Sequence, residues 1–542
     1  MPDQTSYMHQ SIAQSVQDHG IDTMFGLVGD ANLFLANHFV TGCGGKFVAA
    51  VHEGGSVLMA LAYAQASGKV GVATVTQGPG LTNCITALRE GVVARRAMIL
   101  LCGDTPVTVP FHPQNIDQRE LVKATGAGFE QVKSPETASR DVATAFYRAR
   151  AERRPIVVNI PSDFMWAEVK HSRIVFPVER AQGVVTDGPI HEKAIGMIAS
   201  AKRPLILAGA GAASAKDDLI ALAERLEAPL ATTLKGTGLF AGHPYNIGYF
   251  GTLSTDRAYE VIDKADCVIV FGAWLHFLTT DRGKLMDGKR VVLINQEPSD
   301  IGTFFQPDAV LMADAGQTAN NIQYWLDEAE IPPSGFAPEL HSTDIAIHPK
   351  GDPNKSSDGC INFEYALDRL NVALPQNRIM LTDGGRYITE VWCRIGVPEP
   401  NSFHMTDNFA AVGQGMQQAI GAAHGDPDRP VVLFIGDGGF MMGGANEFNT
   451  AVRTNCDLIV ILCNDSAYGA EHIQMKDRQM DTAITEFNWP SFAEVAKAMG
   501  GEGVQVTSPA DLEAAIEAIG SRTGPILVEL KLDPNNVPRM RL

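Results

Sequence analysis

The stretch from residue 431 to residue 469 constrains the fold of this chain most. Val431–Ile435 is a short apolar run bounded by Pro430 and Gly436, which predicts a buried strand. Helical spacing follows over 445–453, and Leu458–Cys463 is a second buried strand. Two buried strands joined by a helix predict a parallel crossover unit, in which both strands end at the same edge of the sheet.

Aspartates lie just after both strands, at the edge where open α/β sheets bind ligands. Asp437 lies in the glycine-rich turn 436–439, and Asp465 lies in Asn464-Asp465-Ser466. Two hard oxygen donors beside backbone N–H groups suit Mg²⁺ or Ca²⁺ carrying a diphosphate. Each motif by itself is equally typical of an ordinary turn that binds nothing.

The spacing of the two motifs resembles the signature of thiamine diphosphate enzymes of the decarboxylase and acetolactate synthase superfamily. Gly-Asp-Gly is followed, after somewhat fewer than thirty residues, by Asn-Asp and then Tyr468-Gly469. The resemblance implies thiamine diphosphate and Mg²⁺ as cofactors, with Asp437, Asp465 and the carbonyl of Ala467 as metal ligands. Asn464 is the alternative ligand. Gly436, Gly438 and Gly439 would contact the cofactor.

Length and composition are ordinary for a large soluble globular protein. The 542 residues suffice for three domains, 45% of them are apolar and 19% are charged. A net charge of −19 without a basic run disfavours nucleic acid and anionic membranes as partners. Eight cysteines without a CxxC pair, and no leader or apolar run of 18 residues, predict a cytoplasmic protein.

Strands and helices alternate along the whole chain, which predicts an α/β protein of three doubly wound parallel-sheet domains. In the first third we expect helices over 6–19, 56–66 and 82–93 and strands over 23–28, 47–51, 70–76, 97–102 and 155–161. The predicted domains are 1–178 (pyrimidine-binding), 189–340 (central) and 361–542 (diphosphate-binding), with a linker over 341–360. Loss of periodicity over 179–188 predicts another linker.

Glu53, directly after a predicted strand, is the main catalytic candidate of the first domain. A carboxylate there is more commonly a helix cap or an ion-pair partner. The runs 68–72 and 78–83 also match the family, so the resemblance implies that Glu53 contacts N1′ of the aminopyrimidine and that Gly78 lies at the cofactor. A buried carboxyl with a raised pKa can share a proton with a ring nitrogen, which drives the imino tautomer that deprotonates C2.

Asp30 and His112 are further candidates. Gly29-Asp30-Ala31-Asn32-Leu33 is similar to a motif of pyruvate decarboxylases whose aspartate is catalytic, but Asp30 could equally cap the next helix. His112 falls where those decarboxylases carry a His-His pair. Pro113 replaces the second histidine, so an ordinary loop histidine is an equal alternative.

The central third carries only a partial glycine fingerprint. Pro204–Ala208 is a predicted strand, followed by Gly209-Ala210-Gly211-Ala212 without the third glycine or the acidic residue of a dinucleotide site. In acetolactate synthases this domain holds FAD, and in simpler decarboxylases it is a structural spacer. We favour the spacer, with FAD as the alternative.

The last third supplies the remaining candidates through the same resemblance. Gly385 and Arg386, after the strand Ile379–Thr382, are expected at the diphosphate. Val412 would support the bent cofactor and the carbonyl of Ala410 would receive its amino group, although an ordinary core valine fits the sequence too. Glu471, six residues past Asp465, has the offset of a catalytic glutamate in keto acid decarboxylases; a solvated glutamate in a first helical turn is the alternative.

The resemblance implies cleavage of a 2-oxo acid with release of CO₂. The acyl unit is then joined to an acceptor aldehyde or ketone, as in acetolactate synthases, or protonated, as in decarboxylases; we place carboligation slightly ahead. A lyase that acts on acyloins or diketones would also fit the sequence, and so, less well, would a non-catalytic family member. In the family, Glu53 of one subunit faces Asp437 of another, so we expect at least a homodimer and usually a homotetramer.

Overall fold

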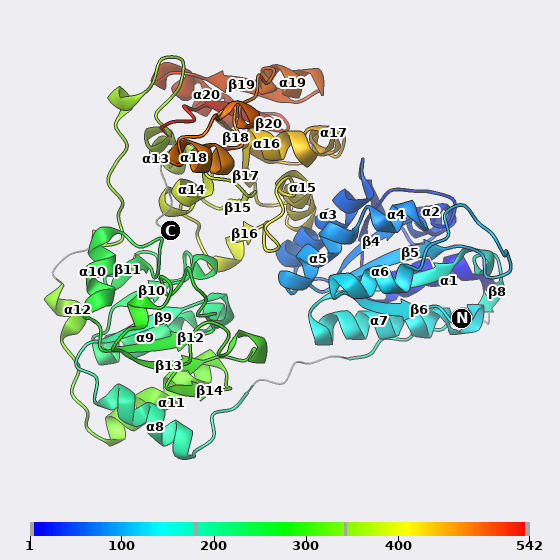
Figure 1. Cartoon of the computed structure of the whole chain (residues 1–542). Coiled ribbons are helices and arrows are strands. Elements are labelled where there is room, and N and C mark those ends of the chain that lie inside the picture. Colours follow the sequence, from blue (N-terminus) through cyan, green and yellow to red (C-terminus); the bar gives the residue numbers. More distant parts are fainter. Residues whose placement is uncertain (1–4, 178–182, 341–343, 537–542) are drawn as a thin grey trace.

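The computed structural model describes residues 5–177, 183–340 and 344–536, and it contains three parallel sheets flanked by helices (Figure 1). The first sheet has the order β3-β2-β4-β5-β7-β6, formed by Lys46–Ala49, Thr23–Gly26, Gly71–Val75, Met98–Asp104, Pro155–Pro161 and Gly128–Gln131. The central sheet has the order β11-β10-β9-β12-β13-β14, formed by Asn246–Tyr249, Leu230–Thr232, Pro204–Ala208, Cys267–Phe271, Arg290–Ile294 and Ala309–Leu311. The third has the order β16-β15-β17-β18-β20-β19, formed by Phe403–Met405, Ile379–Thr382, Val431–Gly436, Leu458–Asn464, Ile526–Lys531 and Glu502–Val506.

The predicted fold class is confirmed, because central strands that are buried along their whole length pair in parallel in all three sheets. In the third sheet, β15 is followed by the edge strand β16, and the chain then returns to β17 on the other side of β15. Such a reversal of strand order creates a crevice at the carboxyl ends of the two strands. Asp383 follows β15 and Asp437 follows β17, so both lie at this switch point. In the first sheet the reversal falls between β2 and β4.

The principal helices lie between these strands. Those of the first domain are α1 (Met8–Asp18), α2 (Leu33–Thr41), α3 (Glu53–Ser67), α4 (Pro79–Thr82), α5 (Ile85–Val93), α6 (Gln118–Thr125) and α7 (Ala138–Glu152). Those of the central domain are α8 (Pro189–Ala199), α9 (Lys216–Leu226), α10 (Asp256–Lys264), α11 (Ala315–Glu328) and α12 (Phe336–Glu339). Those of the last third include α13 (Phe363–Ala373), α14 (Ile388–Arg394), α15 (Gly415–Gly425), α17 (Ala445–Arg453), α18 (Gly469–Asp477), α19 (Phe492–Ala498) and α20 (Pro509–Ser521).

Three local predictions need correction. The first helix begins at Met8 rather than Ser6, because Thr5–Tyr7 (β1) pairs antiparallel with Glu168–Lys170 (β8). The helix predicted over 82–93 begins only at Ile85, as α5. Asn83 and Cys84 separate it from the short helix α4, which ends at Thr82. The helix predicted over 56–66 already begins at Glu53, with His52 as its N-cap.

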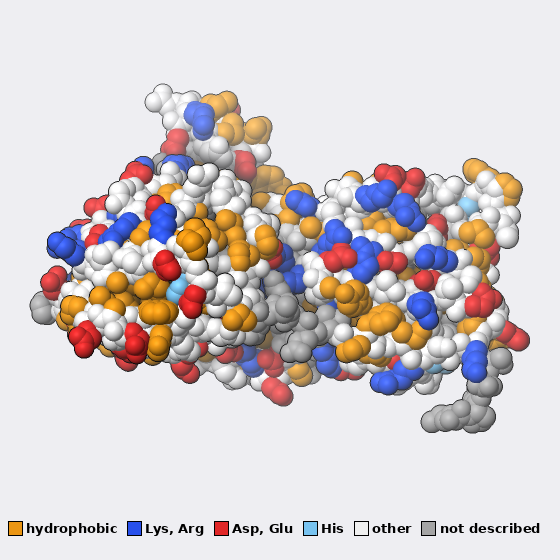
Figure 2. All heavy atoms as spheres, turned by 90° about the horizontal axis from the view of Figure 1, so that it is seen from below, with side chains coloured by type: hydrophobic (Ala, Val, Ile, Leu, Met, Phe, Trp, Pro, Cys, Tyr) orange, Lys and Arg blue, Asp and Glu red, His pale blue; other side chains and the backbone are white. Residues whose placement is uncertain are grey.

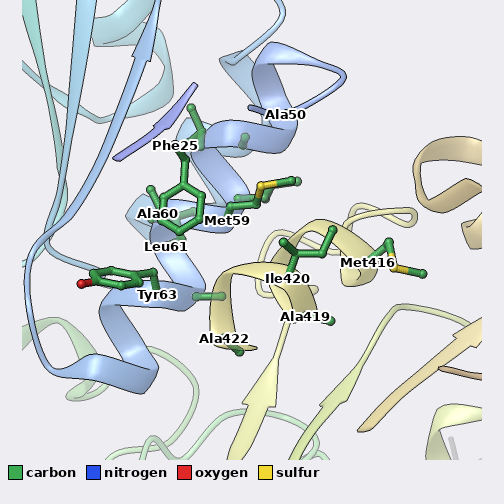
Figure 3. Packing of buried hydrophobic residues seen from close by; sticks show 14 of the residues in the cluster. Phe25, Ala50, Met59, Ala60, Leu61, Tyr63, Met416, Ala419, Ile420 and Ala422 are labelled. Carbon is green, nitrogen blue, oxygen red and sulfur yellow. The ribbon is translucent and has the colours of Figure 1, made fainter. Parts of the chain in front are cut away.

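Helices α3 and α15 join the first and third domains into one hydrophobic core (Figure 3). Met59 of α3 extends towards Ile420 of α15. The helices approach so closely that a Cβ at Gly421 would lie 2.0 Å from the carbonyl oxygen of Met59. This contact therefore fixes how the two domains sit on each other.

Polar contacts join all three domains at a second place. The carboxylate of Glu90, on α5, accepts hydrogen bonds from the backbone N–H groups of Asn408 and Phe409 and from the Asn408 side chain. Lys235 of the central domain donates to the same Asn408 side chain. Arg95, just after α5, pairs with Asp300 of the central domain.

The glycines after β9 serve the packing of the chain itself. A Cβ at Gly209 would lie 2.4 Å from the carbonyl oxygen of Gly272, and one at Gly211 would lie 3.0 Å from the Gly272 backbone. Of the predicted linkers, residues 179–182 and 341–343 lie outside the described residues. The described part of the second linker contains one short 3₁₀ turn, Pro353–Lys355.

Charged side chains of both signs are mixed on one face of the surface. On the face seen in Figure 2, acidic and basic side chains are interspersed, so that face has no basic stripe. Among the described residues, no helix combines the length and the apolar character that crossing a membrane requires.

Candidate functional site

Asp437 begins a helical stretch instead of lying in an open turn, which corrects the prediction for 436–439. Residues Asp437–Gly439 (α16), the π-helical turn Phe440–Gly444 (η9) and α17 follow one another without a break. The glycines make room for neighbouring side chains: a Cβ at Gly439 would lie 2.5 Å from Oδ2 of Asp383, and one at Gly438 would lie 2.9 Å from the Tyr468 ring. The glycine run thus keeps Asp383 and Tyr468 close to Asp437.

Asp437 and Asp465 form a buried acidic pair at the carboxyl ends of β17 and β18. Asp437 Oδ1 accepts a hydrogen bond from the N–H of Gly438 at 2.8 Å, and Oδ2 accepts one from Trp489 Nε1 at 3.0 Å. Burial and the negative charge of Asp465 raise the pKa of Asp437 to about 7. Burial also raises the pKa of Asp465, against the opposing effect of the Arg386 guanidinium 3.3 Å away.

This acidic pair fits a divalent cation bound to a phosphate group. Two buried like charges repel each other and a shared cation removes that repulsion. Among the described residues, no group of three or more His, Cys, Asp and Glu side chains is placed to hold a metal ion, so the pair lacks a third protein carboxylate or imidazole. A six-coordinate hard cation would therefore take further oxygens from a backbone carbonyl, water or the ligand's phosphates.

Asn464 has a structural role in the strand end and is not free to bind a metal. Its side-chain NH₂ donates to Glu529 Oε1 at 2.7 Å, and its amide oxygen accepts from both the N–H and the hydroxyl of Ser466. Asp465 is then the side chain that faces Asp437 and Arg386. Ala467 forms an isolated β-bridge with Glu486. The hydrogen bonds of this bridge are accepted by the carbonyl of Ser466 and donated by the N–H of Tyr468.

Asp383 organises the loop that carries Val412, although no motif in the sequence assigns it this role. Its carboxylate is fully buried and accepts hydrogen bonds from the N–H groups of Gly413 and Gln414. Burial raises its pKa to about 7. Val412 is 43% exposed, which excludes an ordinary core valine. Ala410 has a φ of +59°, a left-handed conformation that re-aims the backbone just before Val412.

Glu447 of the third domain holds the backbone turn that precedes Glu53 of the first domain. Glu53 Oε2 accepts a hydrogen bond from Asn83 at 2.9 Å, and no ion pair forms at Glu53 among the described residues. Glu447, on α17, accepts the N–H groups of Val51 at 3.0 Å and His52 at 3.2 Å. A buried carboxylate of the third domain thereby holds the turn that carries Glu53.

The other first-domain candidates lie around the Gly78 loop. Gly78 has a φ of +58°, and a Cβ there would lie 2.2 Å from the carbonyl of Gln114, two residues beyond His112. His112 Nδ1 accepts the N–H of Gln114. Asp30 is exposed and does not cap α2, whose N-cap is Asn32.

Glu471 lies exposed in the first turn of α18, next to the acidic pair in sequence and in space. A Cβ at Gly469, the first residue of α18, would lie 2.7 Å from Oδ2 of Asp465 and 3.3 Å from Nε of Arg386. Neighbouring His472 is buried and contacts Thr485 and Asn535, so it anchors the helix.

The chain belongs to the thiamine pyrophosphate enzymes, in the superfamily of decarboxylases and acetolactate synthases. Three family models match in chain order: the N-terminal TPP binding domain over 8–121, the central domain over 191–322 and the C-terminal TPP binding domain over 383–530. The chain is therefore an enzyme of the thiamine diphosphate-dependent type, as the sequence predicted.

Relatives of several activities align over nearly the whole chain. A probable 2-ketoarginine decarboxylase of Pseudomonas aeruginosa is 28% identical, with 98% of this chain and 95% of the relative covered. The acetolactate synthase isozyme 2 large subunit of Escherichia coli is 26% identical, with 97% and 95% covered. A sulfoacetaldehyde acetyltransferase of Rhodobacter capsulatus is 28% identical, with 94% and 90% covered.

Proposed function

We propose that this enzyme uses thiamine diphosphate and Mg²⁺ to cleave a 2-oxo acid without oxidation, releasing CO₂ and joining the acyl unit to a second carbonyl compound. The buried Asp437–Asp465 pair carries the cofactor part of this proposal, because its charge calls for a cation that an anionic diphosphate can accompany. The relative named as an acetolactate synthase favours carboligation for the second half, and the relatives named as acetyltransferases agree with transfer of an acyl unit.

Each candidate residue has a definite task in this proposal. When bound, thiamine diphosphate would supply a carbon nucleophile that adds to the substrate carbonyl and a cationic ring that accepts the electron pair of the broken C–C bond. The chain holds Mg²⁺ through Asp437, Asp465 and the Ala467 carbonyl. Glu53 shares a proton with the aminopyrimidine at N1′. The remaining cofactor contacts are assigned to Gly78, Gly385, Arg386, Ala410, Val412, Gly436, Gly438 and Gly439.

Simple decarboxylation is the second candidate, and Glu471 favours it. This carboxylate is exposed at the N-terminus of α18 beside the acidic pair, where it can move a proton to or from a bound substrate. The name of the Pseudomonas aeruginosa relative also points to a decarboxylase. Asp30 and His112 belong to this alternative as further proton-transfer candidates.

A panel of 2-oxo acids tests the proposed reaction. Each acid is supplied with thiamine diphosphate and Mg²⁺, with and without an acceptor aldehyde, and both CO₂ and acyloin are measured. Carboligation predicts acyloin in step with CO₂ when an acceptor is present. Free aldehyde at the same yield with or without acceptor would favour the simple decarboxylase, and no CO₂ from any acid would contradict both.

Two glutamate variants test the assigned tasks separately. Glu53→Gln should bind the cofactor normally but exchange the C2 proton more slowly by about 10²–10⁴-fold, the usual reach of general acid–base catalysis. Glu471→Gln should keep C2 exchange and lose turnover at a later step. Deuterium exchange at C2, read by NMR after acid quench, distinguishes them. If Glu53→Gln exchanges the C2 proton at the wild-type rate, Glu53 has only a structural role at the start of α3.

A further inference from the structure

A groove along α18 leads away from the acidic pair. This α18 groove has a volume of about 470 Å³ and is lined by Tyr468, Glu471, Gln474, Met475, Arg478, Met480, Ile484 and Thr485. Its near end is formed by Tyr468 and Glu471, which lie on either side of Gly469, the residue in contact with Asp465 and Arg386. A molecule reacting beside the acidic pair therefore has this groove next to it.

The lining residues of α18 lie on one face of the helix. Glu471, Gln474, Met475 and Arg478 have the spacing i, i+3, i+4 and i+7. At 1.5 Å per residue, Glu471 and Arg478 are separated by about 10 Å along the helix axis. The groove is thus long enough for an extended chain of several carbon atoms.

The chemistry of the groove changes along its length. Met475, Met480 and Ile484 form apolar walls, and Ile484 is 79% exposed. Arg478 is the groove's cationic residue, and among the described residues no carboxylate lies within ion-pair distance of it. One guanidinium nitrogen, Nη1, donates to the Gln474 carbonyl at 3.0 Å, which leaves donors of the planar fork for a ligand.

We propose that the α18 groove holds the side chain of the substrate, and that Arg478 selects a substrate with an anionic group at the far end of an unbranched apolar chain. This inference rests on the proposed function, because it names the substrate class of the same site. A carboxylate and a sulfonate share the required chemistry. A cationic end, as in the substrate named for the 2-ketoarginine decarboxylase relative, would meet Arg478 as a like charge.

Straight-chain 2-oxo acids of equal length that end in methyl, carboxylate, sulfonate or guanidinium test this selection. The wild-type enzyme should prefer the anionic ends in kcat/KM, and the carboxylate and sulfonate arms decide between the two anions. Arg478→Ala should lower the ratio of kcat/KM for the carboxylate-ended over the methyl-ended acid by about 10–100-fold, through KM, as expected for a lost charged hydrogen bond. Arg478→Lys should retain part of the preference, and Arg478→Glu should shift it towards guanidinium.

Controls separate recognition from a structural effect. Arg478 also caps the carboxyl end of α18, so the Tm of each variant is compared with its substrate ratio; a purely structural role lowers Tm without changing the ratio. Lys476→Ala removes a nearby cation that contacts Asn535 and should leave the ratio unchanged. CO₂ release without any charge preference, or with a preference that survives Arg478→Ala, would overturn the groove assignment alone. No CO₂ from any acid would overturn the proposed function with it.

Discussion

At the scale of residues, the candidate site contains buried carboxyl groups with raised pKa values. Asp437 and Asp383 both have a pKa raised to about 7, chiefly because they are buried. Because the pKa of each carboxyl group is higher in the folded than in the unfolded protein, protonation favours the folded state. This contribution to the free energy of unfolding is fully present below the unfolded-state pKa of about 4 and is lost as the pH rises towards 7. In the proposed function, the pair therefore takes up its cation near neutral pH, where Asp437 ionises.

We expect the stabilisation by Mg²⁺ and thiamine diphosphate to be larger at pH 7.5 than at pH 5.5. Below pH 7 the cation must displace a proton from Asp437, which weakens its binding. Thermal unfolding with and without the ligands measures this, and calorimetry in two buffers detects the released proton. Asp437→Asn should abolish most of the ligand effect, whereas Asp428→Asn, an exposed site on the same domain, should not change it. Equal stabilisation at both pH values would contradict the assignment of the metal to this pair.

At the scale of elements, two of the contacts between the first and third domains can be tested by substitution. One is the hydrogen bonding from Glu447 of α17 to the turn before α3. The other is the close packing of α3 on α15 (Figure 3). The first positions Glu53, and the second fixes the distance between the domains.

Glu447→Ala should slow C2 proton exchange while thiamine diphosphate still binds. The change leaves two backbone N–H groups at the Glu53 turn without their acceptor, which loosens the turn and destabilises the protein by roughly 1–3 kcal/mol. Glu447→Gln keeps an acceptor oxygen and should restore part of the exchange rate. Glu494→Gln, at an exposed position of α19, serves as the control for a lost charge. If Glu447→Ala exchanges the C2 proton at the wild-type rate, Glu447 does not position Glu53.

Gly421→Ala should lower the free energy of unfolding by about 1–3 kcal/mol, because the new methyl group overlaps the Met59 carbonyl and forces α3 and α15 apart. Gly520→Ala is the matched control: Gly520 is also helical, but a Cβ there meets nothing within 4 Å. The same substitution should stabilise that site by about 0.5–1 kcal/mol through helix propensity. Urea unfolding of both variants checks the contrast; equal effects would show that the helix crossing tolerates a methyl group.

At the scale of the whole molecule, the active site is expected to need two subunits. Among the described residues of one chain, Glu53 makes its side-chain hydrogen bond within its own domain. Exposed Phe111 and Val412 lie beside candidate residues of the first and third domains. The family arrangement, in which Glu53 of one subunit faces the cofactor held by another, stays a prediction.

Mixing two inactive variants tests that arrangement. In a dimer with shared sites, Glu53→Gln and Asp437→Ala subunits combine to give one intact site per mixed dimer, so random reassembly should restore about one quarter of wild-type activity. Sites built within single subunits would stay inactive after mixing. Each variant reassembled alone is the control, and size-exclusion chromatography confirms that subunits have exchanged.

The sequence by itself determined the secondary structure that short stretches of residues encode. The crossover unit is predicted by the apolar runs Val431–Ile435 and Leu458–Cys463 and by the helical spacing of 445–453. The spacing of apolar residues can be read from ten to twenty consecutive residues, because it is a local property of the chain. The aspartates that end these strands were likewise predicted to lie together, since parallel strands end at one edge.

Only the tertiary structure decided which groups meet across distant segments. Asp383 reaches the Gly413 loop, Glu447 reaches the Glu53 turn, and Asn464 is held by Glu529, because strand order and helix crossing bring together residues that are 30 to 396 positions apart. The helical start at Asp437 also depends on the fold, since its glycines make room for Asp383 and Tyr468. Such contacts form only when the sheet is complete, so no local pattern in the sequence records them.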